Sequence, residues 1–82
     1  MTFSASTMSL DEATVLRASG FKVTTVLKPC SHRAMFEFED SPATRELLRR
    51  FSHMELIPIS PRNLLITRAD LYREARSARG GL

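Results

Sequence analysis

The chain has 82 residues, of which 43% are hydrophobic and 26% are charged, and its net charge is +3 at pH 7. This balance is typical of one small globular domain and excludes an intrinsically disordered chain. The single cysteine excludes an intrachain disulfide, and with no signal peptide and no apolar run near the roughly 20 residues that span a bilayer, we expect a cytoplasmic protein with no membrane partner.

The first predicted element is a helix near the N-terminus. Ser9 precedes Glu12 by three residues, which is the spacing of an N-terminal capping box, and Thr7 is an alternative cap. Gly20 stands where a helix commonly ends in a left-handed residue, and we expect Phe21, which follows it, to pack back on the helix.

Residues 21–28 and 33–39 predict the two strands of an antiparallel hairpin, because both segments alternate in polarity and a short polar turn joins them. In the second strand, Phe36 and Phe38 share one face, whereas Glu37 lies on the other. A charged side chain resists burial, so the open face of the sheet should be the one that carries Glu37. We therefore expect the two phenylalanines to belong to the core and not to an RNA-stacking platform.

The next segment predicts a helix followed by a short strand. Ser41 is a good N-cap and Pro42 suits the first helical position. Residues 55–59 predict a third strand that Pro58 interrupts. Because proline lacks the N–H that a central strand needs, we expect this strand at an edge of the sheet.

The last element, residues 61–76, has two interpretations. One helix is slightly favoured, although Arg68 falls within its apolar face. The alternative is a strand over residues 63–67 followed by a helix that starts at Thr67.

The predicted fold class is α+β, in the order α-β-β-α-β-α, with an antiparallel hairpin, a third edge strand and the helices packed on one sheet face. We expect a flexible N-terminus over residues 1–6, a single domain over 7–76 and a flexible basic tail over 77–82. The predicted core consists of Leu16, Phe21, Val23, Phe36, Phe38, Leu47, Leu48 and Phe51.

Five segments of the chain, in this order, can be compared with known families: "TMSLDEATVLRASGF", "AMFEFEDSP", "RELLRRF", "ELIPISPRNLL" and "LYREA". This order resembles a family of small bacterial and phage-encoded domains of unknown function, over roughly residues 7 to 76. The most specific part is "FEFEDSP", which ends at Pro42. Ser9 stands where the family usually has Asp, and residues 52–54 replace an Asn-Gly turn. The resemblance implies the fold and a phage or mobile-element origin, but no mechanism.

No pattern of reactive side chains predicts an enzyme, a metal site or a cofactor. Cys30 and His32 lie in one turn, and His53 alone does not complete the four ligands of a structural zinc site. Glu37 and Glu39 lie on one strand face, but carboxylates in this region are better explained by cross-strand pairing and by the dipole of the following helix.

The arginines suggest a nucleic-acid interface. Ten of the twelve basic residues are arginine, whose planar guanidinium suits phosphate. Arg45 and Arg49 share the outer face of the second helix. In a single last helix, Arg62, Arg73 and Arg76 would lie within an arc of about 60°. If these two helices packed side by side, the five arginines would form one arginine ridge that binds the backbone of DNA or RNA without base specificity.

The alternative function is a protein–protein interaction or oligomerisation module. It would act through the predicted edge strand or the C-terminal helix, using Leu56, Ile57, Leu65 and Ile66. A single arginine ridge favours the nucleic-acid hypothesis, whereas scattered arginines favour the protein-interaction module.

Overall fold

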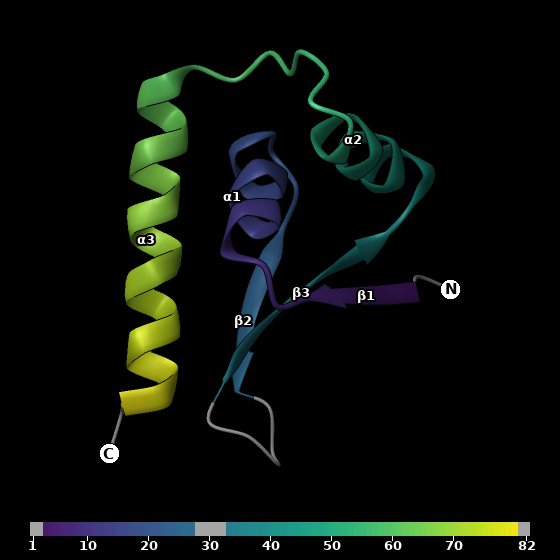
Figure 1. Cartoon of the computed structure of the whole chain (residues 1–82). Helices are drawn as coiled ribbons and strands as arrows, with labels where there is room; N and C mark the ends of the chain where they lie inside the picture. Colours follow the sequence, from purple (N-terminus) through teal and green to yellow (C-terminus); the bar gives the residue numbers. More distant parts are fainter. Residues whose placement is uncertain (1–2, 28–32, 81–82) are drawn as a thin grey trace.

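The structure, a computed structural model, describes residues 3–27 and 33–80 (Figure 1). Its elements in chain order are β1 (Phe3–Thr7), α1 (Leu10–Ala18), β2 (Val23–Leu27), β3 (Ala34–Asp40), α2 (Pro42–Ser52) and α3 (Pro61–Gly80). The strands form an antiparallel sheet in the order β1-β3-β2, and helices pack on one of its faces. The predicted α+β class and the β2–β3 hairpin are confirmed; the turn of the hairpin lies outside the described residues.

The third strand is not where the sequence predicted it. Residues 55–60 have no regular structure, so the predicted edge strand at 55–59 is wrong. Near Pro58, the Ile59 N–H donates to the Ile57 carbonyl at 2.8 Å, a tight local turn that is incompatible with an extended strand. The sheet is completed instead by β1, which includes residues that we expected to be flexible, and the order of elements is β-α-β-β-α-α.

The two faces of the sheet are those that the alternation of polarity predicted. Phe38 lies opposite Val23 on β2, and both side chains are buried under the helices. Glu37 lies opposite Thr24 on the other face, which contributes no residue to the core cluster among the described residues. Phe36 and Phe38 are 3% and 8% exposed, so neither is a stacking platform.

The C-terminal end of α1 follows the predicted signals, whereas the predicted capping box at its start is only half formed, because the Glu12 carboxylate accepts from the Thr7 hydroxyl and not from the Ser9 N–H. The Ser9 hydroxyl accepts a hydrogen bond from the Glu12 N–H at 3.2 Å, and Gly20 has a positive φ of 100°. The Phe21 N–H donates to the Leu16 carbonyl at 3.1 Å, as in a Schellman ending. The cap and the glycine turn therefore mark where this helix begins and ends.

The end of α2 uses the same device without a glycine. Met54 has a positive φ of 57°, and its N–H donates to the Phe51 carbonyl at 3.1 Å. The Glu55 N–H closes the turn on the Arg50 carbonyl at 2.9 Å. Residues 53 and 54 thus form the turn that ends α2, and the chain after it is irregular.

The last element is one helix, so the favoured interpretation of residues 61–76 is confirmed. It continues to Gly80, beyond the start of the predicted flexible tail, and residues 81–82 lie outside the described chain. Leu71 is fully buried and Ala75 is nearly so, and both belong to the main core cluster. Both share a face with Thr67, which is also buried.

The core is centred differently from the prediction. Of the predicted core residues, four are buried: Leu16, Val23, Phe36 and Phe38. The others, Phe21, Leu47, Leu48 and Phe51, are only half-buried. The remaining buried core residues come from α3, which packs directly against α1, whereas α2 lies at the margin of the core.

An ion pair that the sequence did not indicate joins α1, β2 and α3. The Arg17 guanidinium donates to the Glu74 carboxylate and to the Val23 carbonyl, both at 2.5 Å. Thr25 also donates to Glu74 at 3.1 Å. These hydrogen bonds, first that from Arg17, lower the pKa of Glu74.

We expect Glu74→Gln to destabilise the protein by about 1 kcal/mol at neutral pH, the upper end for a surface ion pair, because Glu74 is 42% exposed. The folded pKa is depressed, so this stabilisation is present above the ordinary pKa of 4.5 and is lost as the pH falls through the folded value. Thermal unfolding from pH 7 to pH 3 should therefore bring parent and variant together. Asp11→Asn, which breaks the exposed pair with Arg68, is the control, and an equal effect there would contradict a special role for Glu74.

Candidate interaction surface

The arginines of α2 are paired with carboxylates. Three arginines face three acidic side chains in the pairs Arg45–Asp40, Arg49–Glu46, Arg49–Glu55 and Arg50–Glu46. The Arg45 guanidinium donates to both oxygens of Asp40, at 2.7 and 2.9 Å. Hydrogen bonds from Arg49 and then Arg50 lower the pKa of Glu46 to about 2. Charge in this cluster is balanced, and a phosphate would have to compete with carboxylates already in place.

The arginines of α3 are separated from those of α2. α1 packs against both α2 and α3, and it lies between them in Figure 1. Arg73 pairs with Asp70 at 2.8 Å, whereas Arg62 and Arg76 form no ion pair with a described carboxylate. The side-by-side packing of α2 and α3 that a single arginine ridge required does not occur.

The apolar residues of the alternative hypothesis are mostly exposed. Leu56, in the segment between α2 and α3, is 92% exposed, and Ile57 beside it is half-buried. On α3, Leu65 and Ile66 are 71% and 52% exposed. Single exposed apolar residues are common, so what matters is whether they gather around a hollow.

Leu65 borders one of two hollows along the seam between α1 and α3. This upper hollow, of about 240 Å³, is lined by Asp11, Thr14, Val15, Phe51, Leu64, Leu65 and Arg68. Ile66, Leu56 and Ile57 do not line it. Of the predicted interaction residues, only Leu65 belongs to this hollow.

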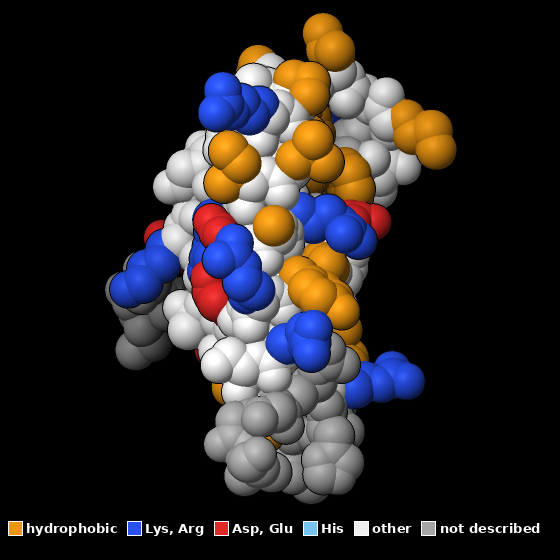
Figure 2. All heavy atoms as spheres, turned by 90° about the vertical axis from the view of Figure 1, so that its left-hand side faces the viewer, with side chains coloured by type: hydrophobic (Ala, Val, Ile, Leu, Met, Phe, Trp, Pro, Cys, Tyr) orange, Lys and Arg blue, Asp and Glu red, His pale blue; other side chains and the backbone are white. Residues whose placement is uncertain are grey.

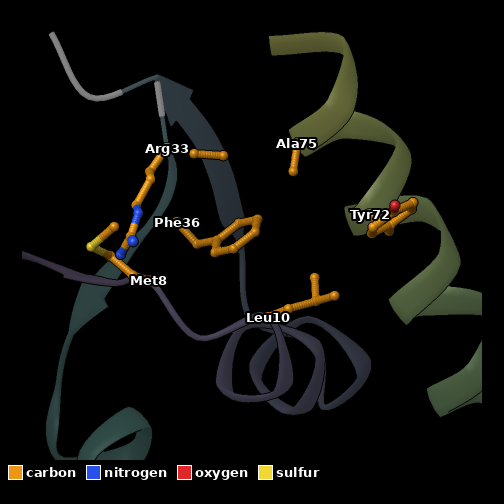
Figure 3. A pocket seen from close by; sticks show the side chains of 7 residues that line it. Met8, Leu10, Arg33, Phe36, Tyr72 and Ala75 are labelled. Carbon is orange, nitrogen blue, oxygen red and sulfur yellow. The ribbon is translucent and has the colours of Figure 1, made fainter. Parts of the chain in front are cut away.

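A lower hollow of about 300 Å³ lies further along the same seam, lined by Met8, Leu10, Arg33, Ala34, Phe36, Tyr72 and Ala75. Figure 3 shows Phe36 pointing into it from β3, with Tyr72 on α3 to one side and Arg33 to the other. The Arg33 side chain extends alongside Met8. The hollow is therefore apolar at its centre and has a cation at its edge.

An ion pair separates the two hollows. The Nε of Arg68 donates to Asp11 at 3.3 Å, and no other hydrogen bond of this guanidinium occurs among the described residues. In Figure 2, which faces α3, apolar side chains form an upper and a lower group on the right-hand half, with basic and acidic side chains between them. We call the two hollows and this ion pair the α1–α3 groove.

Sequence reasoning missed Tyr72 and Arg68 as surface residues of this groove. Leu65, Arg68, Tyr72 and Arg76 follow the spacing i, i+3, i+7 and i+11, so they share one helical face. Arg68 had counted against a single helix. Its place between apolar residues was the available signal that a second, exposed stripe runs beside the buried one.

Other kinds of site find no support among the residues that the structure describes. No group of three metal-binding side chains occurs there, and Cys30 and His32 lie outside the described residues. In the same residues, no helix combines the length and the apolar character that a bilayer crossing requires.

Comparison of the sequence with known protein families, with curated proteins and with solved structures finds no match. The relation to small phage-encoded domains stays a prediction.

Proposed function

We propose that this protein is a non-enzymatic interaction module that binds a partner protein through the α1–α3 groove. The observation that carries the proposal is the position of exposed apolar side chains, Leu65 and Tyr72, at the edges of two apolar hollows on one face. Apolar surface gathered in this way is typical of interaction sites. The predicted edge-strand route is dropped, because residues 55–59 form no strand.

The arrangement of arginines favours this proposal over nucleic-acid binding. Backbone recognition needs cations that are available together, whereas Arg45 and Arg49 are each engaged with carboxylates and are separated from α3 by α1. Non-specific binding to DNA or RNA is kept as the competing hypothesis. It would be recognised by affinity that falls steeply with salt and is lost in Arg45→Glu with Arg49→Glu.

The size of the hollows favours a protein partner over a small molecule. Volumes of about 240 and 300 Å³ are at or below the lower end of the range for ligand pockets, about 300–1,000 Å³. Neither hollow would enclose a drug-sized ligand. Each fits protruding side chains of a partner, with the rest of the partner lying across the rim.

The proposal is tested by selecting displayed peptides of about 20 residues on the immobilised protein. We expect enriched peptides to bind the parent and to lose at least tenfold in affinity on Leu65→Asp, because a charge at the upper hollow opposes apolar docking. Ile66→Asp is the matched control, since it makes the same change on the same helix away from both hollows.

Equal losses in the two variants would contradict groove binding. So would selection that enriches nothing above background. Binding of DNA or RNA by the parent, lost in the Arg45 and Arg49 double variant and retained in Leu65→Asp, would establish the competing hypothesis instead.

A further inference from the structure

We propose that the partner segment bound by the α1–α3 groove is an acidic amphipathic helix. This inference rests on the proposed function and specifies the occupant. Apolar side chains of the partner would enter the two hollows, and its carboxylates would meet the arginines around them.

Most charged side chains around the groove are arginines, and some of their N–H groups have no carboxylate partner among the described residues. Arg33 at the lower hollow and Arg76, one turn beyond Tyr72, form no ion pair with a described carboxylate. Arg68 uses only its Nε in a long hydrogen bond of 3.3 Å to Asp11, so both terminal nitrogens can donate to another carboxylate. A partner helix with acidic residues beside its apolar ones would satisfy these donors.

The spacing of the groove suits a helix. Leu65 and Tyr72 are seven residues apart on α3, which corresponds to about 10.5 Å along the axis at 1.5 Å per residue. A helix lying along the seam would repeat this distance between its own residues i and i+7. Its residues i+3 and i+4, on the same face, would then lie over Arg68.

A second copy of the chain is a poorer occupant. In a two-fold symmetric pair, the same surface faces itself. Arg68 lies between the two hollows, so the Arg68 side chains of both copies would approach each other near the axis, where like charges repel. An acidic partner meets no such repulsion.

The test uses three alanine-based helical peptides with leucine at positions i and i+7 and with glutamate, glutamine or lysine at i+3, i+4 and i+11. We expect the glutamate peptide to bind the parent at least tenfold more tightly than the lysine peptide at low salt. The difference should shrink as salt is added, because the groove is open to solvent.

Substitutions identify the cations responsible. Arg68→Gln with Arg76→Gln should weaken the glutamate peptide about tenfold and leave the glutamine peptide unchanged. Arg45→Gln, a matched loss of charge on α2 at a residue that lines neither hollow, should change neither.

The other outcomes separate this inference from the proposed function. Equal binding of the three peptides, or preference for lysine, overturns the acidic partner while groove binding stands. If the peptides selected for groove binding bind only as extended chains, the proposal of a helical partner segment is overturned. A homodimer of the parent that Leu65→Asp dissociates would replace the partner by a second copy. If no groove-dependent binder of any kind exists, the proposed function fails as well.

Discussion

Phe38→Ala is expected to lower the free energy of unfolding by about 3–5 kcal/mol. Phe38 is 8% exposed on the central strand, where it lies opposite Ala5 on β1 and Val23 on β2 and packs in the main core cluster. Truncation would leave a cavity under the helices that a three-stranded sheet cannot easily close. Since small domains have a total stability of about 5–15 kcal/mol, this loss is enough to unfold much of the population.

Urea unfolding followed by circular dichroism measures this effect. Glu39→Ala is the control, because it shortens a neighbouring exposed side chain on the same strand and should change stability by less than about 0.5 kcal/mol. An unchanged transition midpoint in Phe38→Ala would mean that the faces of β3 are reversed, and would make a stacking platform plausible again.

The elements that the sequence predicted well are those with strong local signals. The capping residues of α1 and α2, and the alternation along β2 and β3, each specify structure over a few residues. The same local rules placed Phe36 and Phe38 in the core. Whether residues 61–76 form one helix or a strand followed by a helix was the hardest case, because Leu64, Leu65 and Ile66 in succession fit either period.

The elements that the sequence missed depend on long-range contacts. β1 alternates Phe3, Ala5 and Thr7 with two serines, a weak pattern that becomes a strand because β3 supplies its hydrogen bonds. Residues 55–59 have the stronger strand composition but no neighbour to pair with.

The groove was only partly foreseeable for the same reason. Leu65 was a candidate because it lies in an apolar run of the sequence, whereas Met8, Arg33 and Tyr72 come together only where three segments distant in sequence meet. The side-by-side packing assumed for the arginine ridge does not occur, because helical spacing predicts the face of one helix but not which helices are neighbours. The carboxylates that pair with Arg49 lie only three and six residues away in the sequence. The more distant pair, with Glu55, depends on how the chain turns at the end of α2.

Leu71→Ala is expected to cost about 2–5 kcal/mol, because Leu71 is fully buried where α3 packs in the core. The comparison with Leu65→Ala separates folding from binding on one helix. Leu65 is 71% exposed, so its truncation should leave the unfolding midpoint nearly unchanged while it lowers the affinity for peptides that bind the groove. Both variants remove the same atoms, so a difference between them reports position alone.

Leu71→Ala should lower stability without changing the affinity of the folded protein, whereas Leu65→Ala should lower affinity without changing stability. Leu71→Ala should reduce the fraction of molecules that are folded. If the partner binds only folded molecules, the affinity of those molecules should equal that of the parent. Peptide titrations at a temperature where Leu71→Ala is mostly folded test this directly, and added peptide should raise its melting temperature. If Leu71→Ala instead weakens binding while fully folded, α3 shifts without unfolding and the groove is more plastic than its packing implies. If Leu65→Ala destabilises the chain as much as Leu71→Ala, Leu65 belongs to the core and the upper hollow is not a docking surface.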